Sequence, residues 1–356
     1  VGMARPFTAD PHLVKKAAEG REDLIRPCIA CNQGCLDSIF TGQESTCLVN
    51  PRVGRENEFP LTPAGRKKNV LVIGGGPAGL EAACRAAQRG HRVTVWEQAG
   101  RLGGQLNLAG VPNGRKEFKT LIRFYEAQIP ESGVKVELNK EATLEEILKF
   151  SPDAVVVATG STPIVPALPG IDRPIVVQAW DVLDRKAGVG DKVIVVGGGA
   201  VGCETALYLA KMGTMPPELL SYWGSYLQED LQQVMSWALK GNKQIIVLEM
   251  KKYIGSDIGI TTRWGILQEL QRCGVKLITG AEVLSIQKNG AEVRHGDEVK
   301  IIPADTIVLA AGSRSQNGLS SSLDGKVPEL YVVGDAAKPR KALDGIREGF
   351  EVGCKI

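Results

Sequence analysis

Aromatic residues make up only 5% of this 356-residue chain, whereas glycine contributes 42 residues. A chain poor in aromatics and rich in glycine is typical of an α/β nucleotide-binding protein rather than of a β-sandwich. With 43% hydrophobic residues, the chain is long enough to form two or three modest domains.

Excess charge and long apolar runs are also missing. The formal net charge is +3 and no dense Lys/Arg tract occurs, so electrostatics give no support for a nucleic-acid or membrane-surface partner. No apolar run approaches the roughly 20 residues of a membrane span, and the N-terminus has no signal-peptide pattern. We therefore expect a cytoplasmic protein with no nucleic-acid partner and no membrane partner.

Two glycine-rich turns each lie between an apolar run and helix-forming sequence. They are VLVIGGGPAG at residues 70–79 and VIVVGGGAVG at residues 193–202. Each apolar run predicts a buried parallel strand, and the apolar runs 154–160 and 306–312 predict further strands that end in glycine. This duplication predicts an α/β fold with two Rossmann-like dinucleotide-binding domains and a final strand at 330–335.

Four regions follow from this pattern. We predict a polar, cysteine-rich segment at 1–65, a first nucleotide domain at 66–165 with 313–356, and a second at 166–312. Residues 213–243 form an insertion that a dinucleotide fold does not require. Its Pro-Pro and Trp-Gly pairs predict a surface excursion with helical parts, and they indicate no function.

The first glycine turn has the features of a phosphate cradle. Gly74 makes the tight turn, Gly76 lets the backbone approach a pyrophosphate, and Gly79 lets the helix pack on the strand. The N–H groups at the helix start, around Pro77 and Ala78, stabilise negative charge together with the helix dipole. Glu97 follows the next strand at the ~20-residue spacing from which a carboxylate accepts a ribose hydroxyl.

Two further motifs favour FAD as the dinucleotide in this first domain. RLGGQ at 101–105 includes Gly104 and Gln105, and the pair Gly334-Asp335 lies near the C-terminus. Together they resemble the flavoproteins with two dinucleotide folds, in which FAD occupies the first fold and the C-terminal Asp holds the ribityl chain. As an alternative, Asp335 is the N-cap of a helix that starts at Ala336, and one side chain can serve both roles.

The second glycine turn predicts a nicotinamide nucleotide site. Gly197, Gly199 and Gly202, with Val201 among them, repeat the cradle, and Glu249 ends the next strand. A carboxylate at that position pairs with free ribose hydroxyls and repels a 2′-phosphate, so it favours NADH. The adjacent residues 251–252 are both Lys, which keeps NADPH open, as does the alternative of a fold that no longer binds a redox nucleotide.

A cysteine pair for disulfide chemistry is missing beside the expected flavin. Residues 98–130 contain no cysteine, and Cys203 and Cys273 are isolated, so we do not expect a disulfide reductase. The isolated cysteines, including Cys84 and Cys354, are predicted to be small core residues.

Four clustered cysteines could instead bind a metal group that accepts electrons from the flavin. They are spaced C-x2-C-x3-C-x11-C, at Cys28, Cys31, Cys35 and Cys47. Soft thiolates suit zinc or iron–sulfur, and three close cysteines with one distant one favour a [4Fe–4S] cluster over the paired knuckles of zinc.

The segments CIACNQGCLD at 28–37 and TCLVNPR at 46–52 closely resemble the cluster segment of bacterial 2,4-dienoyl-CoA reductase. Trimethylamine and histamine dehydrogenases are related, but their third cysteine lies one residue closer. The resemblance implies a preceding TIM barrel that holds FMN and the substrate, and the present chain would begin at the end of that barrel. It also implies an FMN phosphate contact at Arg5 and FAD contacts at the positions Ala78, Glu97, Gln105, Arg115 and Ala142.

The resemblance implies an electron relay from NADH through FAD and the [4Fe–4S] cluster to FMN, for reduction of a conjugated C=C bond. The expected substrate is a small molecule of the acyl-CoA class, an enoyl- or dienoyl-CoA, and the expected partner is an FMN-binding barrel domain or subunit. The alternatives are an amine dehydrogenase-like enzyme that works oxidatively and a stand-alone NADH-dependent electron-transfer subunit. His12, His91 and His295 match no catalytic motif, and no residue is assigned to catalysis.

Overall fold

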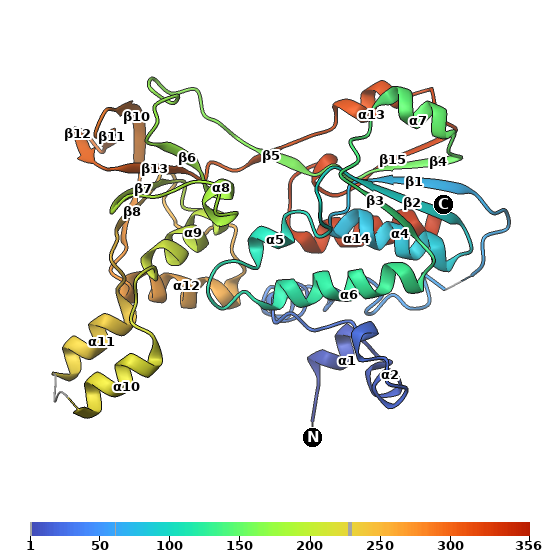
Figure 1. The fold of residues 1–356 in the computed structure, drawn as a ribbon, viewed down its shortest axis with the longest axis horizontal. Coiled ribbons are helices and arrows are strands. Elements are labelled where there is room, and N and C mark those ends of the chain that lie inside the picture. Colours follow the sequence, from blue (N-terminus) through green and yellow to red (C-terminus); the bar gives the residue numbers. More distant parts are fainter. Residues whose placement is uncertain (1, 61, 227–229) are drawn as a thin grey trace. The chain divides into compact units, whose positions relative to one another are not determined.

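The computed structural model describes residues 2–60, 62–226 and 230–356 (Figure 1). The chain divides into two compact units. The first unit comprises Val1–Gly110, Gly114–Thr162 and Ser313–Ile356, and the second comprises Val111–Asn113 and Pro163–Gly312. The cysteine-rich segment belongs to the first unit together with the first glycine loop.

A five-stranded parallel sheet forms the centre of the first unit. Its strand order is β15-β4-β1-β2-β3, with β1 at Asn69–Ile73, β2 at Arg92–Glu97, β3 at Lys135–Leu138, β4 at Ala154–Val157 and β15 at Glu329–Val332. Residues of β1 alternate between two hydrophobic cores, because successive side chains of a strand point to opposite faces. Val70 and Val72 lie in one core, whereas Leu71 and Ile73 lie in the other.

Helices cover both faces of this sheet (Figure 1). On one face lie α4, α5, α6 and α14, at Pro77–Gln88, Leu106–Ala109, Glu117–Glu131 and Ala342–Lys355. On the other face lie α7 at Leu144–Phe150 and α13 at Gly318–Leu323. Glycines allow α14 to approach α4 closely: a Cβ on Gly349 would lie 2.1 Å from the Ala78 carbonyl oxygen.

The N-terminal segment consists mainly of turns with four short helical elements. These are α1 at Arg5–Ala9, α2 at Leu13–Ala18, η1 at Glu22–Leu24 and α3 at Leu36–Phe40. Its buried side chains Ile29, Leu48 and Val49 are part of the same hydrophobic core as α4 and α6. The segment is therefore packed on the first nucleotide fold rather than attached to it only by the chain.

The second unit repeats the sheet architecture. Its strand order is β6-β13-β7-β8-β9, all parallel, with β6 at Val176–Gln178, β7 at Lys192–Val196, β8 at Gln244–Glu249, β9 at Lys276–Thr279 and β13 at Thr306–Leu309. On one face lie α8 at Ala179–Leu183, α9 at Ala200–Ala210 and α12 at Ile260–Arg272. The two sheets establish an α/β protein with two Rossmann-like folds.

An antiparallel sheet covers the other face of the second unit, and the sequence did not predict it. It consists of β10 at Ala281–Gln287, β11 at Gly290–His295 and β12 at Glu298–Pro303. Its inward residues Val283, Ala291 and Val293 share a core with Ile194 and Leu248 of the parallel sheet. Two short paired strands, β5 at Ser161–Pro163 and β14 at Ser313–Ser315, lie where the chain passes between the units.

The insertion 213–243 contains two described helices, α10 at Pro217–Tyr226 and α11 at Leu231–Leu239. They contact each other through Trp223 and Trp237, whose ring centroids are 5.5 Å apart in an edge-to-face arrangement. None of the helices within the described ranges combines the length and apolar character required to cross a membrane.

Candidate cofactor sites

The first glycine loop has no room for side chains at two of its predicted glycines. Gly74 has a φ of 108°, and a Cβ there would lie 2.3 Å from the Ala158 carbonyl oxygen. A Cβ on Gly79 would lie 2.1 Å from the Gly74 carbonyl oxygen. By contrast, nothing lies within 4 Å of the Cβ position of Gly76, the residue just before α4. The loop thus packs tightly on the sheet side and leaves backbone open at the helix start.

Glu97 lies at the end of β2 beside this loop and is buried. One carboxylate oxygen accepts the N–H of Gly75 at 2.6 Å, and the other accepts the N–H of Ala99 at 2.7 Å. Each oxygen has a second lone pair for a ribose hydroxyl. The carboxylate therefore joins the strand end to the loop in addition to its predicted role.

A polar cluster brings together two predicted residues and one that the sequence reasoning missed. The side-chain amide of Gln105 donates to Asp335 at 2.9 Å and to the Ser161 hydroxyl at 3.1 Å. Ser161 donates to the same Asp335 oxygen at 3.1 Å and is buried. No motif marked Ser161, because it follows the glycine that ends the 154–160 strand and has no neighbour with a recognisable pattern.

The alternative role of Asp335 as a helix N-cap is wrong. Asp335 lies inside the short 3-10 helix η2, Gly334–Ala336, whose N-cap is Val333. Its second carboxylate oxygen accepts the backbone N–H of Arg340 at 3.1 Å. Asp335 is thus held by the following turn while its other oxygen faces Gln105 and Ser161.

Further predicted positions converge on the start of α4. A Cβ on Gly104 would lie 3.1 Å from the Cα of Gly76, and a Cβ on Gly334 would lie 3.0 Å from the Cβ of Ala78. The N–H of Gly334 donates to Glu348 of α14 at 2.8 Å, a contact that the sequence did not indicate. Segments far apart in sequence therefore meet around one helix N-terminus.

Arg115 and Ala142 take part in none of these contacts. Arg115 is half-buried in the turn before α6. Ala142 lies in the loop before α7 and packs against the core that contains Leu71 and Trp96. Their predicted FAD contacts remain predictions from the family resemblance.

The second glycine loop repeats the first in detail. A Cβ on Gly197 would lie 2.4 Å from the Ala310 carbonyl oxygen, and a Cβ on Gly202 would lie 1.9 Å from the Gly197 carbonyl oxygen. Glu249 accepts the N–H of Gly198 at 2.8 Å and that of Lys251 at 2.8 Å, as Glu97 does in the first fold.

The start of α9 contains the other two predicted positions of the second fold. Gly199 is the N-cap of α9, and Val201 is 41% exposed in the first turn. A further acidic residue, Asp257, accepts the N–H of Ala200 with both carboxylate oxygens. Asp257 was missed because it lies in the irregular loop after β8, outside any motif.

The four clustered cysteines line one cavity in the first unit. Arg5 and Asn32 also line the cavity, and Cys28, Cys31 and Cys47 pack against the core of the first nucleotide fold. Burial raises the pKa of Cys31 to about 11, and its three neighbouring thiols contribute to the increase. Burial also raises the pKa of Cys47. Clustered thiols of this kind suit a group that brings compensating positive charge.

Tight backbone turns bring these cysteines together. Ala30 and Asn32 both have positive φ, at 52° and 61°. A Cβ on Gly34 would lie 3.0 Å from the Thr46 carbonyl oxygen, so glycine lets the loop with the first three cysteines approach the one with Cys47. Among the described residues, no three His, Cys, Asp or Glu side chains are arranged to hold a single metal ion.

Arg5, the predicted FMN phosphate contact, opens helix α1 and is exposed. Its guanidinium donates to the side chain of Asn32 at 3.0 Å, and both residues line the cysteine cavity. Its role toward FMN stays a prediction. The isolated cysteines Cys84, Cys203 and Cys273 are buried as expected, whereas Cys354 is only half-buried.

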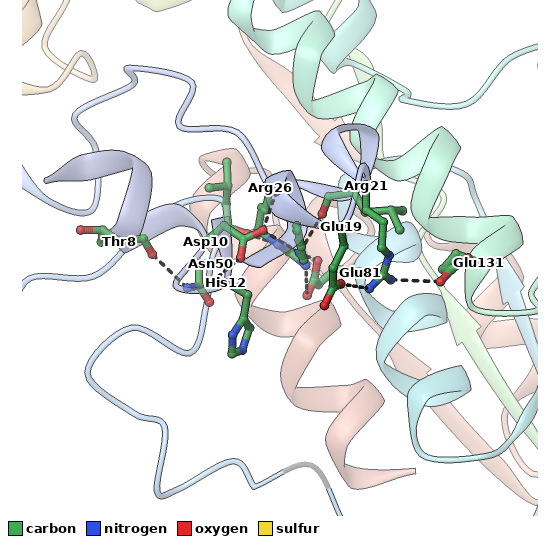
Figure 2. Close-up of polar contacts among 12 residues, drawn as sticks. Thr8, Asp10, His12, Glu19, Arg21, Arg26, Asn50, Glu81 and Glu131 are labelled. Carbon is green, nitrogen blue, oxygen red and sulfur yellow. Dashed lines mark hydrogen bonds and ion pairs between the residues drawn. The ribbon is translucent and has the colours of Figure 1, made fainter. Parts of the chain in front are cut away.

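A buried charge network joins the cysteine segment to the first nucleotide fold (Figure 2). Arg26 pairs with Glu81 of α4 and also donates to the Val49 carbonyl oxygen. Burial lowers the pKa of Arg26, but the Glu81 carboxylate outweighs this and leaves it raised. The OH of Tyr125 donates to Glu81 at 2.9 Å, and burial raises the pKa of Tyr125.

Asp10 extends the network within the segment (Figure 2). Its carboxylate accepts the backbone N–H of Arg26 at 2.8 Å, that of His12 at 2.9 Å and the Lys16 ammonium at 2.6 Å. Burial acts to raise the pKa of Asp10, but these donors outweigh it and hold it below its ordinary value. The chain before Cys28 is therefore held on both sides of Arg26.

Comparisons with known proteins agree with this architecture. Residues 68–349 match the family model described as pyridine nucleotide-disulphide oxidoreductase. A metal reductase of Desulforamulus reducens is 45% identical over the whole chain, which covers 54% of that protein. An NADH oxidase of Thermoanaerobacter brockii is 36% identical, again over the whole chain and 52% of the relative.

A solved structure of a 2-naphthoyl-CoA reductase in complex with 2-naphthoyl-CoA is similar over 99% of the chain. The TM-score is 0.88 at 35% sequence identity, and the match covers 50% of that structure. The chain thus spans about half the length of the relatives that it matches.

Proposed function

This chain belongs to the pyridine nucleotide-disulphide oxidoreductase family, and we propose that it is the NADH-oxidising half of an iron–sulfur flavoprotein that reduces a conjugated C=C bond. Family membership makes it an NAD(P)H-dependent oxidoreductase. The comparisons also confirm the resemblance to the 2,4-dienoyl-CoA reductase family. The specific cofactor chain and substrate are the proposal.

FAD would bind at the first glycine loop. The N–H groups at the start of α4 would face its pyrophosphate, and the cluster of Gln105, Ser161 and Asp335 would hold its ribityl hydroxyls. Bound FAD would accept two electrons as a hydride from the nucleotide and release them one at a time, which is how an iron–sulfur cluster accepts electrons.

NADH would bind at the second glycine loop. Glu249 holds its carboxylate beside the loop through Gly198, where a 2′-phosphate would meet negative charge. This arrangement favours NADH over NADPH. The similarity to the NADH oxidase of Thermoanaerobacter brockii supports the same choice.

A [4Fe–4S] cluster would be held by Cys28, Cys31, Cys35 and Cys47. The observation that carries the proposal is that these four thiols line one cavity, and that the loops bearing them share the hydrophobic core of α4 and α6. A redox group in that cavity would be fixed to the flavin fold itself, as short-range electron transfer requires.

The electron acceptor would lie outside this chain. We infer an FMN in a barrel domain or subunit, with Arg5 at the junction, and a CoA thioester as the substrate. The CoA thioester bound by the similar 2-naphthoyl-CoA reductase supports this substrate class, as does the half-length match to that structure.

Anaerobic reconstitution tests the proposal. After the protein is loaded with FAD, iron and sulfide, NADH should bleach the flavin absorbance, and the cluster should then give a reduced-state EPR signal. A Cys31→Ser variant should still bleach but should lose the EPR signal. Cys84→Ala removes a buried thiol outside the cavity and should behave like the wild type. No bleaching in any of the three proteins would reject the NADH-to-FAD step.

A second candidate acceptor is a chelated metal ion as substrate, which the 45% identical metal reductase favours. The two candidates differ in what they require. Reduction of chelated Fe(III) by NADH should proceed with this chain alone if the second candidate holds. Enoyl-CoA reduction should require the FMN barrel.

A further inference from the structure

The two glycine loops differ at the first residue of their helices. Helix α4 begins with Pro77, which has no N–H, whereas α9 begins with Ala200 at the equivalent place. The Ala200 N–H donates to both oxygens of Asp257, at 3.0 and 3.1 Å. The second fold therefore has a carboxylate on its helix N-terminus, and the first fold has no donor at that place.

Asp257 also lies directly against the open part of the loop. A Cβ on Gly199 would be 3.1 Å from an oxygen of Asp257. In the first fold, nothing lies within 4 Å of the corresponding position at Gly76. The carboxylate thus fills the space that the glycine keeps free for close backbone approach.

The loop that carries Asp257 is anchored, but the side chain is not enclosed. The N–H of Gly255 donates to the Gly198 carbonyl oxygen at 2.6 Å, and Arg263 donates to the Ile254 carbonyl oxygen at 2.8 Å. Ile254 is buried, whereas Asp257 is exposed. A side-chain rotation of Asp257 is therefore enough to clear the helix N-terminus, without a change in the loop backbone.

The N-terminus of the helix after a glycine loop is where a dinucleotide pyrophosphate binds, through backbone N–H groups and the helix dipole. A carboxylate held at this helix N-terminus repels a pyrophosphate that approaches the same place. A nucleotide that enters the second fold must therefore displace Asp257.

We propose that Asp257 determines the affinity of the second site for its nucleotide: it caps α9 in the nucleotide-free protein and yields to the incoming pyrophosphate. The inference rests on the proposed nucleotide site at this loop and adds the residue that competes for it. The cap re-forms when the nucleotide leaves, so Asp257 weakens binding and favours release of the oxidised product.

ADP-ribose, which has the pyrophosphate but no redox chemistry, is the probe. Its dissociation constant is measured by calorimetry on the FAD-loaded protein. Asp257→Asn removes the charge while keeping an acceptor for Ala200, and it should tighten ADP-ribose binding about twofold to fivefold, the range that one charge at a helix N-terminus contributes. Adenosine has no phosphate, and its binding should be unchanged. Asp297→Asn, the same change in the exposed turn between β11 and β12, should leave both affinities unchanged.

A double-mutant cycle tests the contact itself. Ala200→Pro copies Pro77 and removes the N–H that holds Asp257, and proline is well tolerated at the first helical position. In that background Asp257→Asn should no longer alter ADP-ribose affinity. An effect that persists would mean that Asp257 acts only by general charge, and the cap would be rejected.

The remaining outcomes separate this inference from the proposed function. If the wild type binds ADP-ribose and Asp257→Asn binds it equally or more weakly, Asp257 is not a competitor and only the inference fails. If the wild type and the variants all retain FAD but fail to bind ADP-ribose, the second loop is no nucleotide site. Both the inference and the NADH proposal then fall.

Discussion

Arg26 and Glu81 form a two-pronged ion pair between the cysteine segment and helix α4. The distances are 2.8 Å from Nη1 to Oε2 and 3.3 Å from Nη2 to Oε1. The Arg26 guanidinium also lies 4.7 Å from the ring centroid of Phe124 on α6. Because Arg26 precedes Cys28 by two residues and α4 follows the first glycine loop, this pair links the proposed cluster site to the proposed FAD site.

Removing one partner of this pair should destabilise the first unit strongly. Glu81→Leu leaves the Arg26 side chain, which is only 17% exposed, without its carboxylate, and we expect a loss of about 3–5 kcal/mol in the free energy of unfolding. Denaturant titration followed by tryptophan fluorescence measures this loss. The double variant Arg26→Met with Glu81→Leu should recover much of it, since no unpaired charge remains.

Arg21→Ala is the matched control for this test. Arg21 pairs with Glu131 at 3.1 Å, but the side chains are 43% and 52% exposed, so its loss should cost less than about 1 kcal/mol. Equal effects of Glu81→Leu and Arg21→Ala would contradict the anchoring role of the buried pair.

Ser161→Ala should weaken FAD retention without unfolding the protein. The substitution removes the hydroxyl between Gln105 and Asp335, while the direct 2.9 Å contact between those two residues remains. The loss of one hydrogen bond of about 1 kcal/mol corresponds to roughly fivefold weaker FAD binding, measured by flavin fluorescence on dilution. Ser322→Ala on the exposed face of α13 is the control, and a similar loss there would reject a role for Ser161.

Gly202→Ala should disrupt the second glycine loop. The added Cβ would be 1.9 Å from the Gly197 carbonyl oxygen, so the helix or the loop must shift, at about 1–3 kcal/mol, and ADP-ribose binding should fall at least tenfold. Gly265→Ala in α12 meets nothing within 4 Å and should instead add about 0.5–1 kcal/mol of stability. Thermal unfolding measures the stability of both variants, and calorimetry measures their ADP-ribose affinity. Unchanged ADP-ribose binding by Gly202→Ala would contradict the assignment of this loop as a nucleotide site.

His91 should make the first unit less stable in mild acid. It is buried, its Nδ1 accepts the Lys68 N–H at 3.1 Å, and burial lowers its pKa below the ordinary 6.5, aided by Arg89 and Lys68. Below pH 6.5 the unfolded chain therefore binds more protons than the folded one, and stability falls as the pH decreases toward the folded pKa. The slope from this group is at most about 1.4 kcal/mol per pH unit.

His91→Gln keeps an acceptor for the Lys68 N–H. When unfolding is measured from pH 7.5 to pH 5, the free energy of unfolding of this variant should decrease less with falling pH than that of the wild type. His295→Gln, at an exposed position, serves as the control. If His91→Gln loses as much stability in acid as the wild type, another group is responsible for the pH dependence.

Local sequence determined the parts of this protein that depend on backbone sterics. The glycines at 74, 79, 197 and 202 could be assigned because each lies where a strand, a turn and a helix approach too closely for any Cβ. The apolar runs before them predicted buried parallel strands, because strands covered on both faces lose their polar alternation. The grouping of four cysteines was likewise visible, since ligands for one site are close in sequence.

Tertiary structure alone decided which distant side chains complete these sites. Ser161, Glu81, Glu348 and Asp257 belong to no motif, and each acts on a residue that lies 14 to 174 positions away. Contacts of this kind depend on how helices and loops pack on the sheets, which sequence periodicity does not encode. The sequence therefore predicted the two glycine cradles and the group of cysteines, whereas packing decided that Arg26 meets Glu81 and that Asp257 meets Ala200.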